Sequence, residues 1–466
     1  MTRLGTSPAR PPGPPGHFLV GNLPEFARDI LGFFSTCTRE YGDIVHMRLA
    51  GNDVFLLENP RDIETVLLTE RNNFIKHTFF FRHVTAIFGN GLLTSEGDFW
   101  LRQRRLAAPA FHPDRIASYG SVMAAFARRT ADRWRPWEVR DVYRDLMRLT
   151  MEIVSKTLFD AEVAEESAEI ERSFDRIVRQ IAKRFRRPFR IPDLVPTPGN
   201  LLYRRGVARL DRLVAKILEE RRTRPGDRGD LLSMLLAARD DDGQPMSDQQ
   251  VRDEVITLFL AGHETTAITL AWALDLLARH PEVDRRASQE ITERLGERLP
   301  TAADLLRLPY VEAVVKETLR LCPPAYVIGR EPLADCTLGG YPVPARSTVY
   351  FAPWVLHRDP RWWNEPDNFR PERWLDGSIA TLPKYVYLPF GGGPRVCIGE
   401  RFAMMETVLV LATLLPRFRF ETAGPAPRPF PSITLRPDRP VLMRLVARSS
   451  PASLASRVPR SESRVF

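Results

Sequence analysis

The chain of 466 residues carries 67 basic and 58 acidic side chains, which gives a formal net charge of +9 at pH 7. Because the basic residues are interleaved with acidic ones and no DNA- or RNA-recognition motif occurs, nucleic-acid binding is excluded. The four cysteines form no CxxC pair and have no histidine at ligand spacing, which excludes a disulfide framework and a structural zinc site.

Residues 1–16 and 447–466 differ in composition from the sequence between them. The first segment ends in the proline-rich "PPGPPG" and is too short and too polar for a signal peptide or a membrane anchor, which predicts a cytoplasmic protein. The last segment mixes serine, arginine and proline without periodicity, which predicts disorder. Residues 17–446 contain no linker or repeat, so we expect one large domain there. The excess of arginine over lysine indicates a GC-rich, bacterial genome.

Helix-forming sequence dominates the chain, and short strands are expected near the start and after residue 330. Strand-like runs lie at 42–51 and 52–58, and a third stretch at 335–353 contains Gly339 and Gly340 as a turn signal. The sequence therefore predicts a mainly α fold with small β-sheets.

Two segments before residue 112 have distinctive side chains. The segment "HTFFFRHVTAIFGN" is rich in phenylalanine and favours an apolar ligand; its phenylalanines are Phe79, Phe80, Phe81 and Phe88. In the following "WLRQRRLAAPAF", Trp100 and Arg104 are four residues apart and share one helix face.

A long helix is predicted from Ser247 to His280. It starts with a capping box and contains no proline over roughly thirty residues, a length of about 50 Å. Its sequence is apolar enough for a membrane span, but His263 and Glu264 in the middle would be costly in lipid. We therefore expect a helix that crosses the protein core and can bend at Gly262.

Two short motifs follow this helix. In "KETLR", Glu317 and Arg320 are three residues apart and can pair on one helix face, although this spacing alone is common on solvated helices. In "FRPERW", Arg373 stands two residues after a proline.

The stretch "FGGGPRVCIG" presents Cys397 directly before a helix predicted over residues 400–415. The N-terminus of that helix favours a thiolate. Gly393 and Gly399 remove side chains on both sides, which leaves room for a large flat group, and Arg395 supplies a cation for an acid on that group. A nucleophile, a redox sensor, a metal ligand and a buried structural cysteine all remain possible from this stretch alone.

The chain resembles the cytochrome P-450 superfamily of haem-thiolate monooxygenases. The residues from Phe390 to Gly399 match the pattern F-x-x-G-x-R-x-C-x-G of its haem-binding loop, and the preceding motifs occur in the family's order. The resemblance implies the cytochrome P-450 fold, a single large helical domain around haem. The helix that carries "AGHETT" would be its central I helix.

The resemblance also implies roles for the motif residues. Cys397 would be the axial thiolate ligand of haem b, which favours O–O bond cleavage. Glu264 and Thr265 would manage proton delivery. The ion network that supports the loop would contain Glu317, Arg320 and Arg373. The residues expected to contact haem are Trp100, Arg104, Ala261, Arg330, Phe390, Arg395, Cys397 and Gly399. Those expected to line the substrate pocket are Phe79, Phe80, Phe81, Phe88, Phe259, Ala325, Val327, Ile328 and Ile433.

The implied reaction inserts one atom of O2 into an apolar small molecule, such as a fatty acid or terpenoid, by hydroxylation or epoxidation. The chain contains no G-x-G-x-x-G motif at a helix start and no iron–sulfur cysteine set. Electrons are therefore expected from a ferredoxin or flavodoxin and its NAD(P)H-dependent reductase, steered by Arg102, Arg104, Arg105 and Arg401. A monomer is expected. The alternatives are a peroxide-driven peroxygenase, an electron-independent haem-thiolate isomerase or dehydratase, and a non-catalytic haem sensor.

Overall fold

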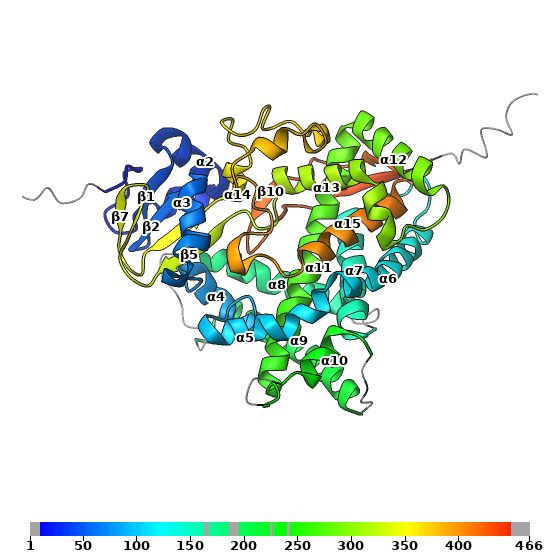
Figure 1. Cartoon of the computed structure of the whole chain (residues 1–466), viewed down its shortest axis with the longest axis horizontal. Coiled ribbons are helices and arrows are strands. Elements are labelled where there is room, and N and C mark those ends of the chain that lie inside the picture. Colours follow the sequence, from blue (N-terminus) through cyan, green and yellow to red (C-terminus); the bar gives the residue numbers. More distant parts are fainter. Residues whose placement is uncertain are drawn as a thin grey trace, which may run out of the picture.

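The molecule has a β-rich part and a larger helical part, which lie on the left and right of Figure 1. Helices contain 56% of the residues, in agreement with the predicted mainly α fold. The computed structural model describes residues 10–162, 167–185, 195–223, 226, 228–239 and 243–448. Apart from Ala447 and Arg448, the tail predicted to be disordered lies outside the described residues.

The helices keep the numbering of Figure 1 throughout. They are α1 (Leu23–Arg28), α2 (Ile30–Tyr41), α3 (Pro60–Glu64), α4 (Phe79–Phe88), α5 (Gly97–Ala107), α6 (Pro113–Asp132), α7 (Val142–Phe159), α8 (Ser167–Phe185), α9 (Pro198–Thr223), α10 (Leu231–Ala237), α11 (Asp248–Arg279), α12 (Pro281–Leu295), α13 (Pro309–Leu321), α14 (Pro353–Leu356) and α15 (Glu400–Leu414).

The strands form one larger sheet and three small ones. The five-stranded sheet has the order β1 (Ile44–Leu49), β2 (Asn52–Leu57), β8 (Thr348–Phe351), β5 (Ile328–Pro332) and β3 (Phe74–Ile75). The small sheets contain β4 (Val139–Asp141), β12 (Leu442–Ala447) and β9 (Phe418–Thr422); β6 (Cys336–Leu338) and β7 (Tyr341–Val343); and β10 (Pro429–Pro431) and β11 (Leu435–Pro437).

The strands pair both within hairpins and between distant segments. β1 and β2 form an antiparallel hairpin, and β8 joins β2 in parallel, which brings segments far apart in the sequence into one sheet. Gly339 and Gly340 connect β6 to β7 with φ values of 56° and 82°, in the left-handed region that glycine tolerates best. The strand predictions at 42–58 and 335–353 are therefore confirmed.

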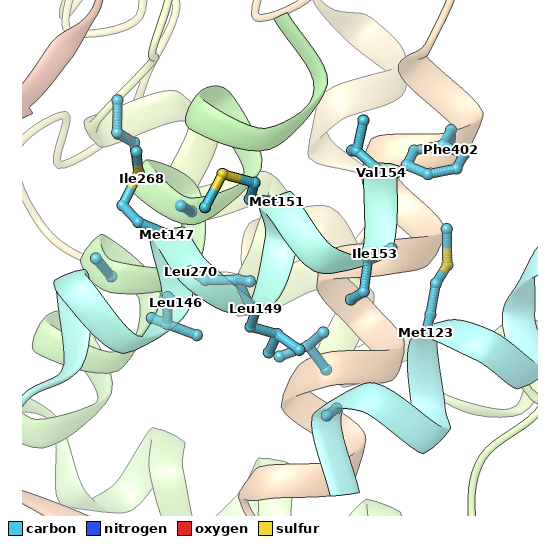
Figure 2. Packing of buried hydrophobic residues seen from close by; sticks show 14 of the residues in the cluster. Met123, Leu146, Met147, Leu149, Met151, Ile153, Val154, Ile268, Leu270 and Phe402 are labelled. Atoms are coloured by element: carbon cyan, nitrogen blue, oxygen red, sulfur yellow. The ribbon is translucent and has the colours of Figure 1, made fainter. Parts of the chain in front are cut away.

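Helix α11 lies at the centre of the helical part, and α7 packs along it. Figure 2 shows how apolar side chains of α7 meet those of α11, α6 and α15; the labelled residues are Met123, Leu146, Met147, Leu149, Met151, Ile153, Val154, Ile268, Leu270 and Phe402. Buried side chains occur all around α11 rather than on one stripe, as expected of a helix enclosed on every side.

The long helix predicted from the sequence is present as α11. Its capping box at Ser247 and Gln250 is formed, and its C-cap is His280. Among the described residues, α11 alone is long and apolar enough to cross a membrane, but 83% of its most apolar window is buried inside the protein. The helix is continuous across Gly262, where α7 comes so close that an added Cβ would stand 3.0 Å from Val154.

Candidate functional site

A cavity of about 390 Å³ lies beside the middle of α11. Its wall contains side chains of α4, α5 and α11, the segment after α13, the loop before α15 and residues near β11. Most of this wall is apolar, which is typical of a pocket for a small apolar ligand.

Cys397 reaches this cavity from a closed loop. Its backbone N–H donates to the carbonyl of Phe390 over 2.9 Å. At Gly393 φ is 64°, and a Cβ there would stand 2.1 Å from the carbonyl oxygen of Leu67. The interpretation that Gly393 makes room for a flat ligand is therefore wrong, because this glycine is needed for the turn and for contact with Leu67. Gly399 leaves its neighbours, Cys397 among them, at ordinary contact distance.

The expected thiolate does not follow from the helix N-terminus alone. Burial raises the pKa of the Cys397 thiol, while a hydrogen bond from the Gly399 N–H and the charges of Arg104 and Lys76 lower it. A metal ion deprotonates a coordinating thiol outright. Cys397 is thus a thiol that metal coordination would convert to the thiolate.

Four cations gather at one end of the cavity. Three of them, Arg104, Arg330 and Arg395, were predicted from the sequence, and the fourth is Lys76. They lie close enough to one another to interact, since the charges of Arg330, Arg395 and Arg104 all act on Lys76. Lys76 lies just after β3 in no recognisable motif, so only the tertiary structure reveals it.

The described partners of this cluster are too few to neutralise it. Arg395 lies 3.9 Å from the centre of the Trp100 ring and forms an ion pair with Glu96, but its buried Nη1 has no partner among the described atoms. Arg104 donates to the carbonyl of Val396 over 2.8 Å. Among the described residues, the Glu96 carboxylate is therefore the one ion-pair partner found for this cluster of four cations.

Burial makes these unbalanced charges costly. It lowers the pKa of Arg395 to about 10, and together with the charge of Arg395 it lowers the pKa of Arg330 to about 10. Burial also holds the pKa of Lys76 well below its usual range, and Arg330 and Arg395 add to this effect. An anion bound among them would stabilise all three charged forms.

This donor set fits haem. The Cys397 thiol would ligate the iron, the cationic side chains would pair with the two propionates, and the buried Nη1 of Arg395 would gain an acceptor. Trp100, Ala261 and Phe390 lie on the same cavity wall, as do Gly399 and the other predicted haem contacts.

The predicted ion network is formed and fully buried. Arg320 makes a double contact with Glu317, at 2.9 and 2.8 Å, and Arg373 donates to the same carboxylate over 3.0 Å. The indole of Trp374 donates to it over 2.9 Å. The Trp374 indole therefore adds a further N–H donor to this buried carboxylate, one that a phenylalanine could not supply.

A buried histidine connects the network to the loop of Cys397. The Arg320 guanidinium donates to the carbonyl of His357, and the His357 ring accepts from the backbone N–H of Leu388 over 2.8 Å. Burial, with the charge of Arg320, lowers the pKa of His357 to about 3, which keeps the ring neutral and able to accept. The network therefore supports the loop two residues before Phe390.

Both residues expected to handle protons lie at the cavity wall. The Thr265 hydroxyl donates to the carbonyl of Ala261 over 2.8 Å. The Glu264 carboxylate is buried and accepts from the hydroxyl of Thr434 over 3.0 Å and from the guanidinium of Arg436. No sequence pattern pointed to these two partners, since they lie beyond the last motif.

The predicted substrate residues divide into three groups. Phe81, Phe88, Ala325, Val327, Ile328 and Ile433 line the cavity. The side chains of Phe79 and Phe80 lie outside the described residues. Phe259 is misplaced in the prediction: its ring packs in the core against Phe159 and His263. It stands two residues before Ala261, which is about 200° around the helix and so on the opposite side.

Comparison of the sequence and the fold with known proteins shows the family of this chain. A family model described as "Cytochrome P450" matches residues 11–443. Cyclooctatin synthase of Streptomyces melanosporofaciens is 37% identical over 431 residues, 91% of this chain and 91% of that protein. Pentalenene oxygenase of Streptomyces avermitilis is 34% identical over 446 residues, 96% and 98% of the two chains. A structure titled "Retinoic acid bound cyanobacterial CYP120A1" matches with a TM-score of 0.85 at 28% identity, over 95% of this chain and 100% of that one.

The site and fold thus define a haem-iron oxidoreductase that uses O2. The chain belongs to the cytochrome P450 family and is a monooxygenase that acts on an apolar substrate with electrons from redox partners.

Proposed function

We propose that the protein uses haem b to hydroxylate a neutral terpenoid. The observation that carries this proposal is the distribution of charge in the cavity. The basic side chains among the described lining residues are Lys76, Arg104, Arg330 and Arg395, and all belong to the cluster that matches the haem propionates. No described lining residue outside this cluster offers a cation for the carboxylate of a fatty acid, which favours a neutral substrate.

The names of relatives support the same class. Cyclooctat-9-en-7-ol 5-monooxygenase of Streptomyces melanosporofaciens is 37% identical over 433 residues, and by its name it acts on an unsaturated alcohol. Pentalenene oxygenase is named for a hydrocarbon. Terpenoid oxygenation by these relatives agrees with an apolar wall that carries a few hydroxyl groups, such as those of Thr257 and Thr269.

When bound, haem b supplies the iron that activates O2, with Cys397 as its thiolate ligand. In the proposed mechanism, the chain's own residues bind the substrate, exclude water and deliver protons. Thr265 presents a hydroxyl at the cavity wall that can hold a water molecule. Glu264, fixed by Thr434 and Arg436, is the carboxylate beside it that relays protons to the cavity.

The electron donor in this proposal is a ferredoxin or flavodoxin reduced by an NAD(P)H-dependent reductase, and the protein acts as a cytoplasmic monomer. Arg105 and Arg401 are exposed and can attract an acidic carrier; Arg105 is on α5, which contacts the Cys397 loop through Arg104, and Arg401 is on α15, which follows that loop. Arg104 is excluded from this role, because it contacts Val396 at the cavity.

Binding spectra test the substrate class. The protein reconstituted with haem b is titrated with a neutral cyclic terpene alcohol and with a fatty acid of equal carbon number, and the spin-state shift of the Soret band is recorded. The terpenoid is expected to bind and the fatty acid to bind far more weakly. Preference for the fatty acid would contradict the proposal.

Turnover tests the reaction type. Product is expected with a ferredoxin, a reductase and NAD(P)H, and not with the protein alone; product with hydrogen peroxide alone at a higher rate would indicate a peroxygenase. In the reduced carbon monoxide complex, the red-shifted Soret band of a thiolate-ligated haem is expected, and Cys397→Ser should abolish it. Retention of that band in the variant would remove Cys397 as ligand.

A further inference from the structure

Consecutive residues near the start of α11 contact the backbone that leads out of α4. The Arg252 guanidinium donates to the carbonyl of Ile87 over 3.2 Å, at the C-terminal end of α4. It also pairs with Asp211 of α9. Asp253 accepts from the backbone N–H of Asn90 over 2.8 Å and is almost completely buried. One turn of α11 thus holds both α9 and the end of α4.

The next residue continues this pattern. Glu254 is 1% exposed, and one of its oxygens accepts from the backbone N–H of Leu92 over 3.1 Å. Glycines permit the close approach: a Cβ on Gly89 would stand 2.2 Å from the carboxyl group of Asp253, and a Cβ on Gly91 would stand 2.6 Å from its carbonyl oxygen. Gly89 has a φ of 56°, which also favours glycine.

The segment held in this way forms part of the substrate cavity. Phe88, Leu92 and Leu93 line the cavity wall. A few residues later, Glu96 pairs with Arg395 and accepts from the backbone of Lys76 over 2.7 Å. Residues 87–96 therefore run from α11 to the cation cluster, and their position sets the shape of one cavity wall.

We propose that Arg252, Asp253 and Glu254 form a clasp that positions residues 87–96 over the substrate, and that the clasp determines access to the cavity and the orientation of the substrate in it. The inference rests on the proposed function in taking this cavity as the haem and substrate site. The clasp residues act through the segment they hold and are positioning residues. A buried N–H that loses its acceptor is costly to leave unpaired, so these hydrogen bonds suit a segment that must stay closed over a ligand.

Two variants remove the clasp, and two matched variants keep it. Glu254→Leu and Asp253→Ala each remove an acceptor for the segment. Glu254→Gln keeps an oxygen that accepts from Leu92 and is the conservative control. Asp275→Ala removes another buried carboxylate of α11, one that pairs with Arg279 and does not contact the segment.

Hydrogen–deuterium exchange of the amides of Asn90 and Leu92 tests the clasp without any substrate. Exchange is expected to rise about tenfold in the two breaking variants, since a buried N–H left without its acceptor changes local opening by about this factor. Glu254→Gln and Asp275→Ala should exchange like the parent. Equal exchange in all the variants would overturn the clasp, whether or not the protein is a monooxygenase.

Binding of phenylimidazole, which ligates haem iron from the cavity side, tests the role of the clasp in the cavity. Its dissociation constant should rise in Glu254→Leu and in Asp253→Ala as the closed fraction falls, by about twofold where half of the molecules are open, because only the closed fraction forms the full wall. The two breaking variants should also form additional products from any accepted terpenoid. Faster exchange with unchanged affinity and products would overturn the positioning role, as would an equal loss of affinity in Asp275→Ala.

Discussion

The buried carboxyl group of Glu254 gives the protein a stability that depends on pH. Burial raises its pKa to about 7; the Leu92 N–H opposes this shift, and the charge of Asp253 adds to it. The folded state therefore binds the Glu254 proton more tightly than the unfolded state. The tighter proton binding of the folded state contributes its full stability below the unfolded pKa of Glu254, near 4.5. This contribution is lost as the pH rises through the folded pKa of about 7.

The size of the effect follows from the shift. One pKa unit corresponds to about 1.36 kcal/mol, so a shift from 4.5 to about 7 costs the ionised folded state on the order of 3 kcal/mol. Most of that cost appears between pH 5 and pH 8, because the shifted pKa lies in this range. Glu254→Gln keeps the shape and the acceptor but does not titrate, so it should remove this part of the pH dependence.

Urea denaturation at pH 5 and pH 8 measures the effect. The free energy of unfolding of Glu254→Gln minus that of the parent should be larger at pH 8 than at pH 5 by roughly 2 to 3 kcal/mol. Glu282→Gln, at an exposed position of α12, is the control and should give the same difference at both pH values. An equal difference for Glu254→Gln at both pH values would show that Glu254 does not titrate in this range.

Three further predictions concern the network, the cations and the proton path. Trp374→Phe removes one donor to the buried Glu317 carboxylate and should cost about 1.5 to 3 kcal/mol of unfolding free energy, measured by urea denaturation; a cost near zero would mean that the indole contact is dispensable. Lys76→Met keeps the bulk but removes a cation, and its rate of haem loss to apomyoglobin should rise about tenfold, a rate that would stay unchanged if Lys76 does not face a propionate. Thr265→Ala should keep a normal carbon monoxide spectrum, while product per NAD(P)H falls and hydrogen peroxide release rises, because general acid–base assistance is worth about 100- to 10,000-fold. Parent-like coupling in that variant would make Thr265 a packing residue.

The local features of the site could be predicted because they depend on residues close in the sequence. The capping box, the length of α11, the helix after Cys397 and the turn at Gly339 and Gly340 all follow from periodicity or backbone preference over a few residues. The ion network was also predicted, since its members belong to motifs of a known family. Their burial explains why the motifs matter physically: an incomplete network would leave charges unpaired away from water.

Contacts between distant parts of the chain could not be predicted in this way. Glu96 and Arg395 are 299 residues apart, and Glu264 and Arg436 are 172 residues apart. Phe259 was assigned to the wrong surface because the sequence reveals that a helix is apolar but not which side of a fully buried helix faces a cavity. Gly393 was explained by a ligand although Leu67 is its close neighbour.

The sequence by itself determined the family, the fold class, the central helix and the identity of the cysteine loop. Local residue spacing determines the backbone conformation of each element, and the order of the motifs along the chain identifies the family. The tertiary structure alone decided which cations share the cavity, which partners hold Glu264 and how α11 holds the segment before α5. These contacts depend on where packing brings separate elements together, and the free energy of each comes from burial and charge that exist only in the folded chain.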